Sequence, residues 1–256
     1  FYASCEKIFR PDLKNKPVVV LSNNDGCIIA RSPEAKKMGL IMGQPWHEVK
    51  NNYLNNGGVV FSSNYELYAD ISNRVMNILM ESCPEIDIYS IDEAFLNLKS
   101  YEKNIDLVRF AFDCKRRLRE WIGIPVSIGI APTKTLAKLA NKMAKDDSRF
   151  EGVVILKDEN TIKHFLKNIN TEKIWGIGKR MEKNLKDIGI DNALELRNFN
   201  PRLSGNNFSV VLERTIRELR GQACIGSENM LEPKKQIMVS RLSLIHISEP
   251  TRREYI

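Results

Sequence analysis

Short apolar or alternating stretches recur through the first 156 positions of the chain. A β-branched run at 17–21 precedes Asn24-Asp25-Gly26, which favours a tight hairpin turn because Asp-Gly tolerates positive φ values. Ile86 and Ile88 alternate with polar residues, the period expected of a half-buried strand. These patterns predict strands at 17–21, 27–30, 59–61, 126–130 and 153–156, and two more within 86–98, joined around 90–94.

Apolar residues spaced three or four apart predict helices between these strands. Leu67, Ile71 and Val75 mark one such helix, which Pro84 closes, and Ser32 can cap another. The predicted helices are 32–39, 64–82, 105–121 and 134–145. Strands that alternate with helices and hairpins indicate an α/β fold in which helices cover a mixed sheet.

The pattern changes after about Asn160, where no strand signal remains. Short helices are predicted at 162–166, 178–188, 193–197 and 208–220. This change indicates a domain boundary. The last stretch, 242–256, has neither sustained periodicity nor a cap, and we assign it to neither domain.

Composition and charge narrow the class of protein. The 256 residues include 39 Lys and Arg against 32 Asp and Glu, a net charge of +7, which raises the prior for a polyanionic partner such as nucleic acid. No apolar run approaches the roughly 18 residues needed to cross a bilayer. Five cysteines without a C-x-x-C pair argue against a disulfide framework or a zinc site, and favour a reducing cytoplasm. The sequence begins at Phe1 without a signal segment, and we expect its start to be cut.

Asp92-Glu93, between two predicted strands, is the sharpest chemical feature. Adjacent carboxylates at a strand bend can bind divalent cations, and phosphoryl transfer uses two such ions roughly 3.5–4 Å apart. A polar hairpin tip is the simpler interpretation of the dipeptide alone.

Two groups of basic residues could face phosphates. Four lysines recur along one flank of the predicted helix 134–145, and a solvated helix face is the alternative interpretation. Arg31, Lys36 and Lys37 form a second cluster, for which an ordinary surface role serves equally well. The lysines of the first group are Lys134, Lys138, Lys142 and Lys145.

The segment that begins at Trp175 resembles a helix-hairpin-helix element. Gly176 and Gly178 would let backbone amides approach a phosphate closely, and Lys179 and Lys183 add positive charge. A tight turn between structural helices is the competing interpretation.

Five motifs taken together are specific. They are 1–6 (FYASCE), 22–27 (SNNDGC), 61–70 (FSSNYELYAD), 89–95 (YSIDEAF) and 134–141 (KTLAKLAN). In this order they resemble Y-family translesion DNA polymerases, and 210–221 is also shared with the UmuC-like branch, the catalytic subunits of the bacterial SOS mutagenic polymerase.

The resemblance implies a right-hand polymerase core with a mixed-sheet palm. Fingers, with the truncated start of the palm, would occupy 1–67, the catalytic palm 68–158, and a helical thumb with the helix-hairpin-helix 159–232. Residues 233–241 would be a linker. The little-finger domain would be absent, and 242–256 resembles nothing in the family, so we expect that tail to be artefactual.

The resemblance also implies site roles. Asp92 and Glu93 would be catalytic and would hold two Mg²⁺ ions. Tyr2 matches a steric gate that selects deoxynucleotides, with Phe1 as its packing partner; Lys145 and Lys36 match residues that contact the incoming triphosphate. A further metal-binding aspartate is expected upstream of Phe1. The chain by itself would then be catalytically impaired, whereas the intact protein would be active.

The implied function is error-prone, template-directed DNA synthesis in translesion synthesis and SOS mutagenesis. Primer–template DNA and deoxynucleoside triphosphates would be the substrates. A UmuD-like dimer, a RecA filament and a sliding clamp would be partners of the intact protein, in the bacterial cytoplasm at the nucleoid. The alternatives are a non-catalytic DNA-binding relative and a palm-fold nucleotidyl cyclase.

Overall fold

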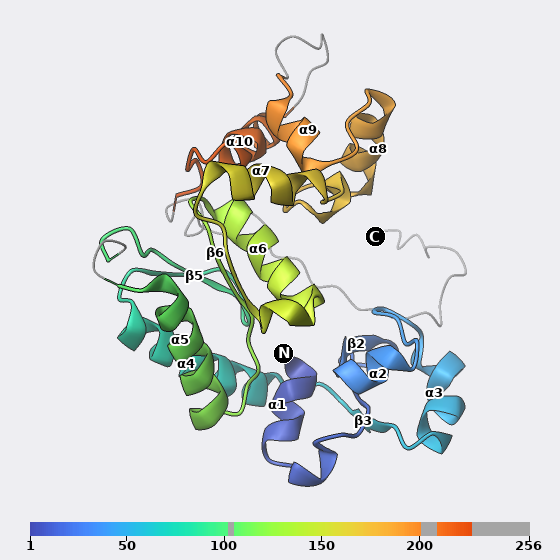
Figure 1. The fold of residues 1–256 in the computed structure, drawn as a ribbon. Helices are drawn as coiled ribbons and strands as arrows, with labels where there is room; N and C mark the ends of the chain where they lie inside the picture. Colours follow the sequence, from blue (N-terminus) through green and yellow to red (C-terminus); the bar gives the residue numbers. More distant parts are fainter. Residues whose placement is uncertain (102–104, 201–208, 227–256) are drawn as a thin grey trace, which may run out of the picture.

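The computed structural model describes residues 1–101, 105–200 and 209–226. Figure 1 shows these residues as three groups of elements, with the N-terminal helices at one end, the later helices at the other, and a layer of strands and long helices between them. The expected linker 233–241, the tail 242–256 and the end of the expected thumb lie outside the described residues. Within residues 1–101, 105–200 and 209–226, no helix combines the length and the apolar character needed to cross a membrane.

A three-stranded sheet organises the N-terminal group. Its order is β2-β1-β3, with β2 antiparallel and β3 parallel to β1. Successive residues of β1 point to opposite faces, so Val18 and Val20 enter one apolar core while Val19 and Leu21 enter another. The elements are α1 Tyr2–Ile8, η1 Pro11–Leu13, β1 Val18–Leu21, β2 Ile28–Arg31, α2 Pro33–Lys37, α3 Trp46–Asn55 and β3 Val59–Phe61.

The predicted strands and the helix after Ser32 are confirmed here. The Ser32 side chain caps α2 by accepting a hydrogen bond from the Ala35 amide, and Asp25 takes the positive φ of 53° that the turn requires. Sequence periodicity missed α1 and α3. The buried residues of α3 are Trp46 and Tyr53, seven positions apart, too sparse to form an apolar stripe.

The middle group divides its strands between two pairs. β4 and β5 are antiparallel, and β6 and β7 are parallel, so the mixed sheet expected here consists of two separate ladders among the described residues. Helix α6 crosses β6 so closely that a Cβ atom at Gly129 would collide with the backbone of Ala137 and Asn141. The elements are α4 Tyr65–Ser82, β4 Ile86–Ile88, β5 Ala94–Leu96, α5 Leu107–Trp121, β6 Ile128–Ile130, α6 Lys134–Asp146, η2 Ser148–Phe150 and β7 Val153–Ile155.

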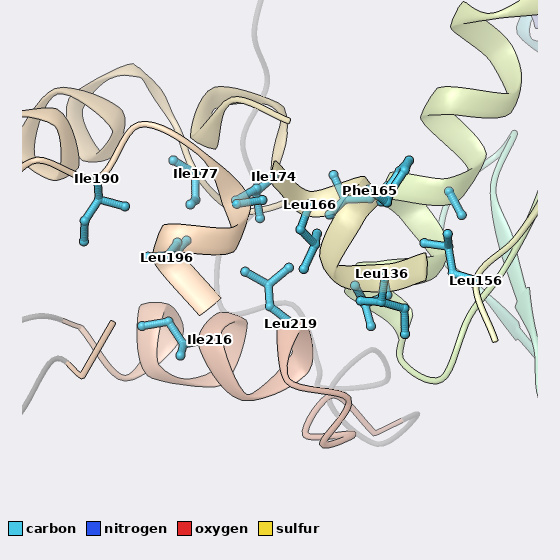
Figure 2. Packing of buried hydrophobic residues seen from close by; sticks show 14 of the residues in the cluster. Leu136, Leu156, Phe165, Leu166, Ile174, Ile177, Ile190, Leu196, Ile216 and Leu219 are labelled. Atoms are coloured by element: carbon cyan, nitrogen blue, oxygen red, sulfur yellow. The ribbon is translucent and has the colours of Figure 1, made fainter. Parts of the chain in front are cut away.

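Only helices follow β7 among the described residues. They pack with α6 into a single apolar core, in which Leu136 of α6 lies among Phe165, Leu166 and Leu219 (Figure 2). The elements are α7 Glu159–Lys167, η3 Thr171–Lys173, α8 Lys179–Asp187, α9 Ala193–Asn198 and α10 Val210–Leu219. We call this set, from α7 to α10, the helical unit. Helix α6 therefore belongs to the middle layer and to the core of the helical unit at once.

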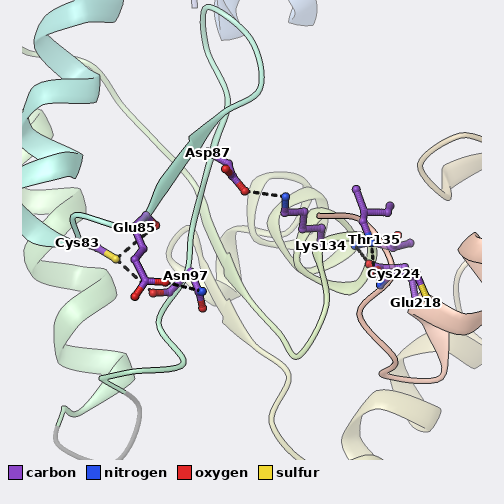
Figure 3. Close-up of polar contacts among 9 residues, drawn as sticks. Cys83, Glu85, Asp87, Asn97, Lys134, Thr135, Glu218 and Cys224 are labelled. Atoms are coloured by element: carbon purple, nitrogen blue, oxygen red, sulfur yellow. Dashed lines mark hydrogen bonds and ion pairs between the residues drawn. The ribbon is translucent and has the colours of Figure 1, made fainter. Parts of the chain in front are cut away.

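A buried carboxylate fastens α10 to the start of α6. Glu218 is fully buried, and its Oε2 accepts a hydrogen bond of 3.0 Å from the Thr135 amide in the first turn of α6 (Figure 3). Its Oε1 accepts bonds from the amides of Cys224 and Ile225 at 2.6 and 3.2 Å. Thr133, the cap of α6, donates its hydroxyl to the Glu218 carbonyl at 2.8 Å. Three otherwise unpaired amides are thereby satisfied by one side chain.

Candidate active site

Asp92 and Glu93 lie at the tip of the β4–β5 hairpin, and both side chains are exposed. The tip is folded back on itself, since the amides of Tyr89 and Ser90 both donate to the Glu93 carbonyl at 3.0 Å. Ser90 also donates its hydroxyl to Asp92 Oδ1 at 2.9 Å. The two carboxylates are thus presented to solvent from an ordered turn.

The base of the same hairpin is anchored by polar contacts. Asn97 donates its side-chain amide to Glu85 Oε2 at 2.7 Å and its backbone amide to the Glu85 carbonyl at 2.9 Å (Figure 3). The buried Cys83 thiol points to the carbonyls of both residues. These contacts hold the strands that carry the tip.

Tyr2 belongs to a cluster of aromatic rings beside this tip. Its ring stacks on the fully buried Tyr68 with centroids 4.3 Å apart and planes 13° apart, and the Tyr65 ring meets it edge-on at 6.0 Å. Tyr68 is itself fixed, because its hydroxyl donates to Glu6 Oε1 at 2.6 Å. Burial, followed by the nearby Tyr65 and Asp92 groups, raises the pKa of Tyr2. Stacking on the Tyr68 ring therefore restricts the orientation of the Tyr2 ring.

Charges from three parts of the chain converge on this corner. Asp92, Lys145 and Lys36 all lie within electrostatic range of the backbone nitrogen of Phe1. The pKa of Lys36 is lowered, by burial first and then by the charges of Lys145 and Arg31. Cations that repel one another next to a carboxylate pair form a suitable place for a polyanion that coordinates metal.

The row of four lysines on α6 is divided by the structure. Lys134 pairs with Asp87 at 2.7 Å (Figure 3), and Lys138 pairs with Glu93 at 3.0 Å. Lys142 and Lys145 are exposed and form no ion pair among the described residues. Lys134 and Lys138 therefore fit neither interpretation of the row, a phosphate-binding flank of four lysines or a solvated helix face, because both already neutralise carboxylates of the hairpin.

The donor set at the tip suits magnesium. Within the described ranges, no group of three or more His, Cys, Asp or Glu side chains gathers as a metal cluster. Mg²⁺ is, however, commonly held through one or two carboxylates, with water and substrate phosphates completing its shell. The exposed carboxylate pair Asp92-Glu93 fits that requirement.

Comparison with protein families decides the ancestry. The impB/mucB/samB family model matches residues 1–142, more than half of the chain. The chain belongs to the impB/mucB/samB family. UmuC from Salmonella typhimurium is 48% identical over 242 residues, which cover 94% of this chain and 57% of UmuC. The UmuC-like, Y-family assignment made from the sequence motifs is confirmed.

More distant members of the family agree in sequence and in fold. DNA polymerase IV from Picrophilus torridus is 33% identical over 204 residues, covering 78% of this chain and 57% of that protein. The crystal structure of DinB from Sulfolobus solfataricus superposes with a TM-score of 0.69 at 26% identity, covering 85% of this chain and 64% of DinB. The chain therefore spans rather more than half the length of these relatives, and the polymerase-core fold is confirmed.

The family's helix-hairpin-helix motif matches residues 159–190. This match confirms the element predicted around Trp175. Gly176 adopts a φ of +87°, a conformation that side chains other than glycine rarely take, while Gly178 caps α8 with an ordinary φ of −89°. Lys179 and Lys183 are exposed on α8.

One arrangement in this family member could not be anticipated from the motifs. Trp175 of the helical unit reaches the hairpin, where its Nε1 donates to the Tyr89 hydroxyl at 3.3 Å. Lys138 lies against both rings. The lysine was visible in the sequence as part of a basic row, but no local pattern links positions 89, 138 and 175.

Proposed function

We propose that the full-length protein containing this chain is an error-prone, template-directed DNA polymerase that acts in translesion synthesis and SOS mutagenesis. The observation that carries the proposal is the convergence of Asp92, Lys36 and Lys145 on the Phe1-Tyr2 corner. These residues come from the hairpin, from α2 and from α6, and together they suit a deoxynucleoside triphosphate with its metals. Family membership supports the same reaction class.

The substrate would be oriented by cations and by an aromatic ring. Lys36 and Lys145 would contact the triphosphate, whose charge relieves their mutual repulsion. Tyr2, packed against Tyr68 and adjacent to Phe1, would lie under the sugar and exclude a 2′ hydroxyl by contact with its ring. Because the stack leaves Tyr2 little freedom to move aside, it suits the role of a steric gate.

The reaction is a nucleotidyl transfer. The 3′ oxygen of the primer bonds to the α-phosphorus of the nucleotide, the bond from that phosphorus to the departing pyrophosphate breaks, and the hydroxyl proton is released. Asp92 and Glu93 would hold two Mg²⁺ ions, which when bound lower the pKa of the attacking hydroxyl and offset the charge of the triphosphate.

The helix-hairpin-helix would grip the DNA backbone. Nothing lies within 4 Å of where a Cβ atom would sit at Gly176 and Gly178, which leaves room for a phosphate beside this backbone, and Lys179 and Lys183 add charge. This element favours a polymerase over a nucleotidyl cyclase, which has no use for a duplex grip.

The finer divisions and partners belong to the same proposal. Residues 1–67 would form the fingers, 68–158 the palm and 159–232 the thumb. A UmuD-like dimer, a RecA filament and a sliding clamp would be partners of the intact protein in the cytoplasm, at the nucleoid. Co-purification of each partner with the full-length protein tests that part.

Primer extension tests the activity. The full-length protein should extend a primer in a Mg²⁺-dependent reaction, and Glu93→Gln should lower kcat by about 10³-fold, because several kcal/mol of charge stabilisation are removed. Glu120→Gln is the matched control, since that exposed carboxylate on α5 forms only a surface pair with Arg116. Unaltered extension by Glu93→Gln would overturn the assignment.

A further inference from the structure

The ammonium group of Lys138 is enclosed by two aromatic rings and a carboxylate. Its Nζ lies 4.4 Å from the centre of the Tyr89 ring, 4.8 Å from the centre of the Trp175 ring and 3.0 Å from Glu93 Oε2. The lysine side chain retains 20% of its exposure, against 49% for Glu93. A cation is attracted to the faces of aromatic rings as well as to a carboxylate, so all three contacts hold the ammonium group in this position.

The two rings come from different parts of the fold. Tyr89 directly follows β4, on the hairpin that carries Glu93, whereas Trp175 belongs to the helical unit. The rings meet edge to face at 5.3 Å, and Trp175 is flanked by Ile174 and Ile177, which are both buried in the apolar core shared with α6. Trp175 is thus held by the core of the helical unit while its ring packs against the hairpin.

Stability alone gives little reason for this arrangement. A partly exposed ion pair contributes about 0–1 kcal/mol, and a cation over an exposed ring about 0.5–1 kcal/mol. What the contacts do is restrict Glu93, since Oε2 is held by Lys138 while no hydrogen bond from the described residues engages Oε1. The ion pair thus favours one orientation of the carboxylate and leaves its other oxygen available.

We propose that Lys138 is a positioning residue that orients Glu93 for divalent-metal binding, and that Trp175 keeps Lys138 in place, so that docking of the helical unit on the hairpin completes the metal site. This inference builds on the proposed function, in which Glu93 is a metal ligand. A pre-oriented ligand loses less conformational freedom when a metal binds.

Two roles are open to Lys138, and they predict opposite changes in metal affinity. If Lys138 orients Glu93, then removing its charge weakens metal binding. If Lys138 instead competed with the metal for the same carboxylate, removing its charge would strengthen metal binding. Measured metal affinity therefore separates the two, whatever the rate of DNA synthesis.

The test measures Mn²⁺ binding to the full-length protein with primer–template DNA, from the electron paramagnetic resonance signal of free Mn²⁺. Lys138→Met keeps the length of the side chain and its packing between the rings; the dissociation constant should rise by about 10- to 100-fold, as for other residues that orient metal ligands. Lys138→Arg should recover most of that loss, because a guanidinium also stacks on aromatic rings and pairs with a carboxylate. Trp175→Ala should produce a smaller loss in the same direction.

Lys142→Met is the control, one helical turn further along α6, and should leave the affinity unchanged. Unchanged or tighter Mn²⁺ binding by Lys138→Met would overturn the proposal, as would an unchanged affinity in Trp175→Ala. Primer extension, measured in parallel, distinguishes a failure of the positioning role from a failure of the proposed polymerase activity. Normal extension by the parent with no effect of Lys138→Met on Mn²⁺ binding refutes only the positioning role. If the parent protein extends no primer and Lys138→Met still weakens Mn²⁺ binding, the positioning role is supported and the polymerase assignment is refuted.

Discussion

The two ends of helix α6 differ in what surrounds them. At its start, Thr133 and Thr135 bond to Glu218, and Lys134 and Lys138 pair with the carboxylates of the β4–β5 hairpin. At its end, Lys145 shares a corner with Lys36, another cation, and burial and the Lys145 and Arg31 charges lower the pKa of Lys36. The polar groups at the start of the helix are paired within the protein, whereas the lysine near its end forms no ion pair among the described residues.

This difference shows how one helix serves two purposes. Lysines 134 and 138 contribute to the assembly of hairpin, α6 and helical unit, and their charge is already offset. Lys145 forms no ion pair among the described residues, and it is one of the lysines that we propose to contact the triphosphate. Identical side chains, two or three turns apart on one helix, thus differ in how far their charge is offset, because the rest of the fold places different groups opposite them.

The largest effect is expected at the start of the helix. Glu218→Ala removes an acceptor shared by three backbone amides and should lower the free energy of unfolding by about 3 kcal/mol. Glu218→Gln, which keeps one acceptor oxygen, should cost about half of that. Urea denaturation of the full-length protein measures both. Glu172→Ala, an exposed carboxylate of the helical unit, is the control, and an equal effect in both alanine variants would contradict the buried-acceptor account.

A smaller effect is expected in the middle of α6, where the helix crosses β6. Gly129→Ala places a methyl group against the backbone of Ala137 and Asn141, which have no side-chain freedom with which to yield. Overpacking of this kind should destabilise the protein by about 2 kcal/mol, because the helix must move off the strand. The urea midpoint reports this, and an unchanged midpoint would mean that α6 is not held at the observed distance.

The smallest effect in energy is expected at the end of the helix. Lys145→Met should raise the KM for deoxynucleotides by about tenfold, which corresponds to about 1.4 kcal/mol, the loss of one charged contact to a phosphate. Its unfolding free energy should stay within about 0.5 kcal/mol of the parent. Lys142→Met, exposed on the same helix, should change neither quantity. If Lys145→Met altered stability while sparing KM, the contrast between the two ends would be broken.

Much of the fold was predictable because its signals are local. The β-branched residues of β1, the Asp25 turn and the stripe of α4 each lie within a few residues of one another. The division of the middle strands into two ladders was not predictable, since pairing between distant strands leaves no trace in their separate patterns. Helix α3 escaped because two buried aromatic residues, rather than a stripe, fix it.

The candidate site divides in the same way. The carboxylate pair Asp92-Glu93 and the Tyr2 position were identified from contiguous motifs, whose residue order is itself the signal. The residues that pack against them were not identified. Tyr68, which stacks on Tyr2, is 66 positions away in the chain, and Lys138, which pairs with Glu93, is 45 positions away. Their roles follow only from distances and ring angles.

The sequence by itself determined the local elements, the motifs that indicate the family and the residues able to carry charge. The tertiary structure alone decided which of those charges are already neutralised. The reason is physical: the electrostatic effect of a lysine depends on what lies within a few ångströms of its ammonium group. At Lys138 those neighbours are Glu93 and Tyr89 of the hairpin and Trp175 of the helical unit, two segments that are distant in the chain.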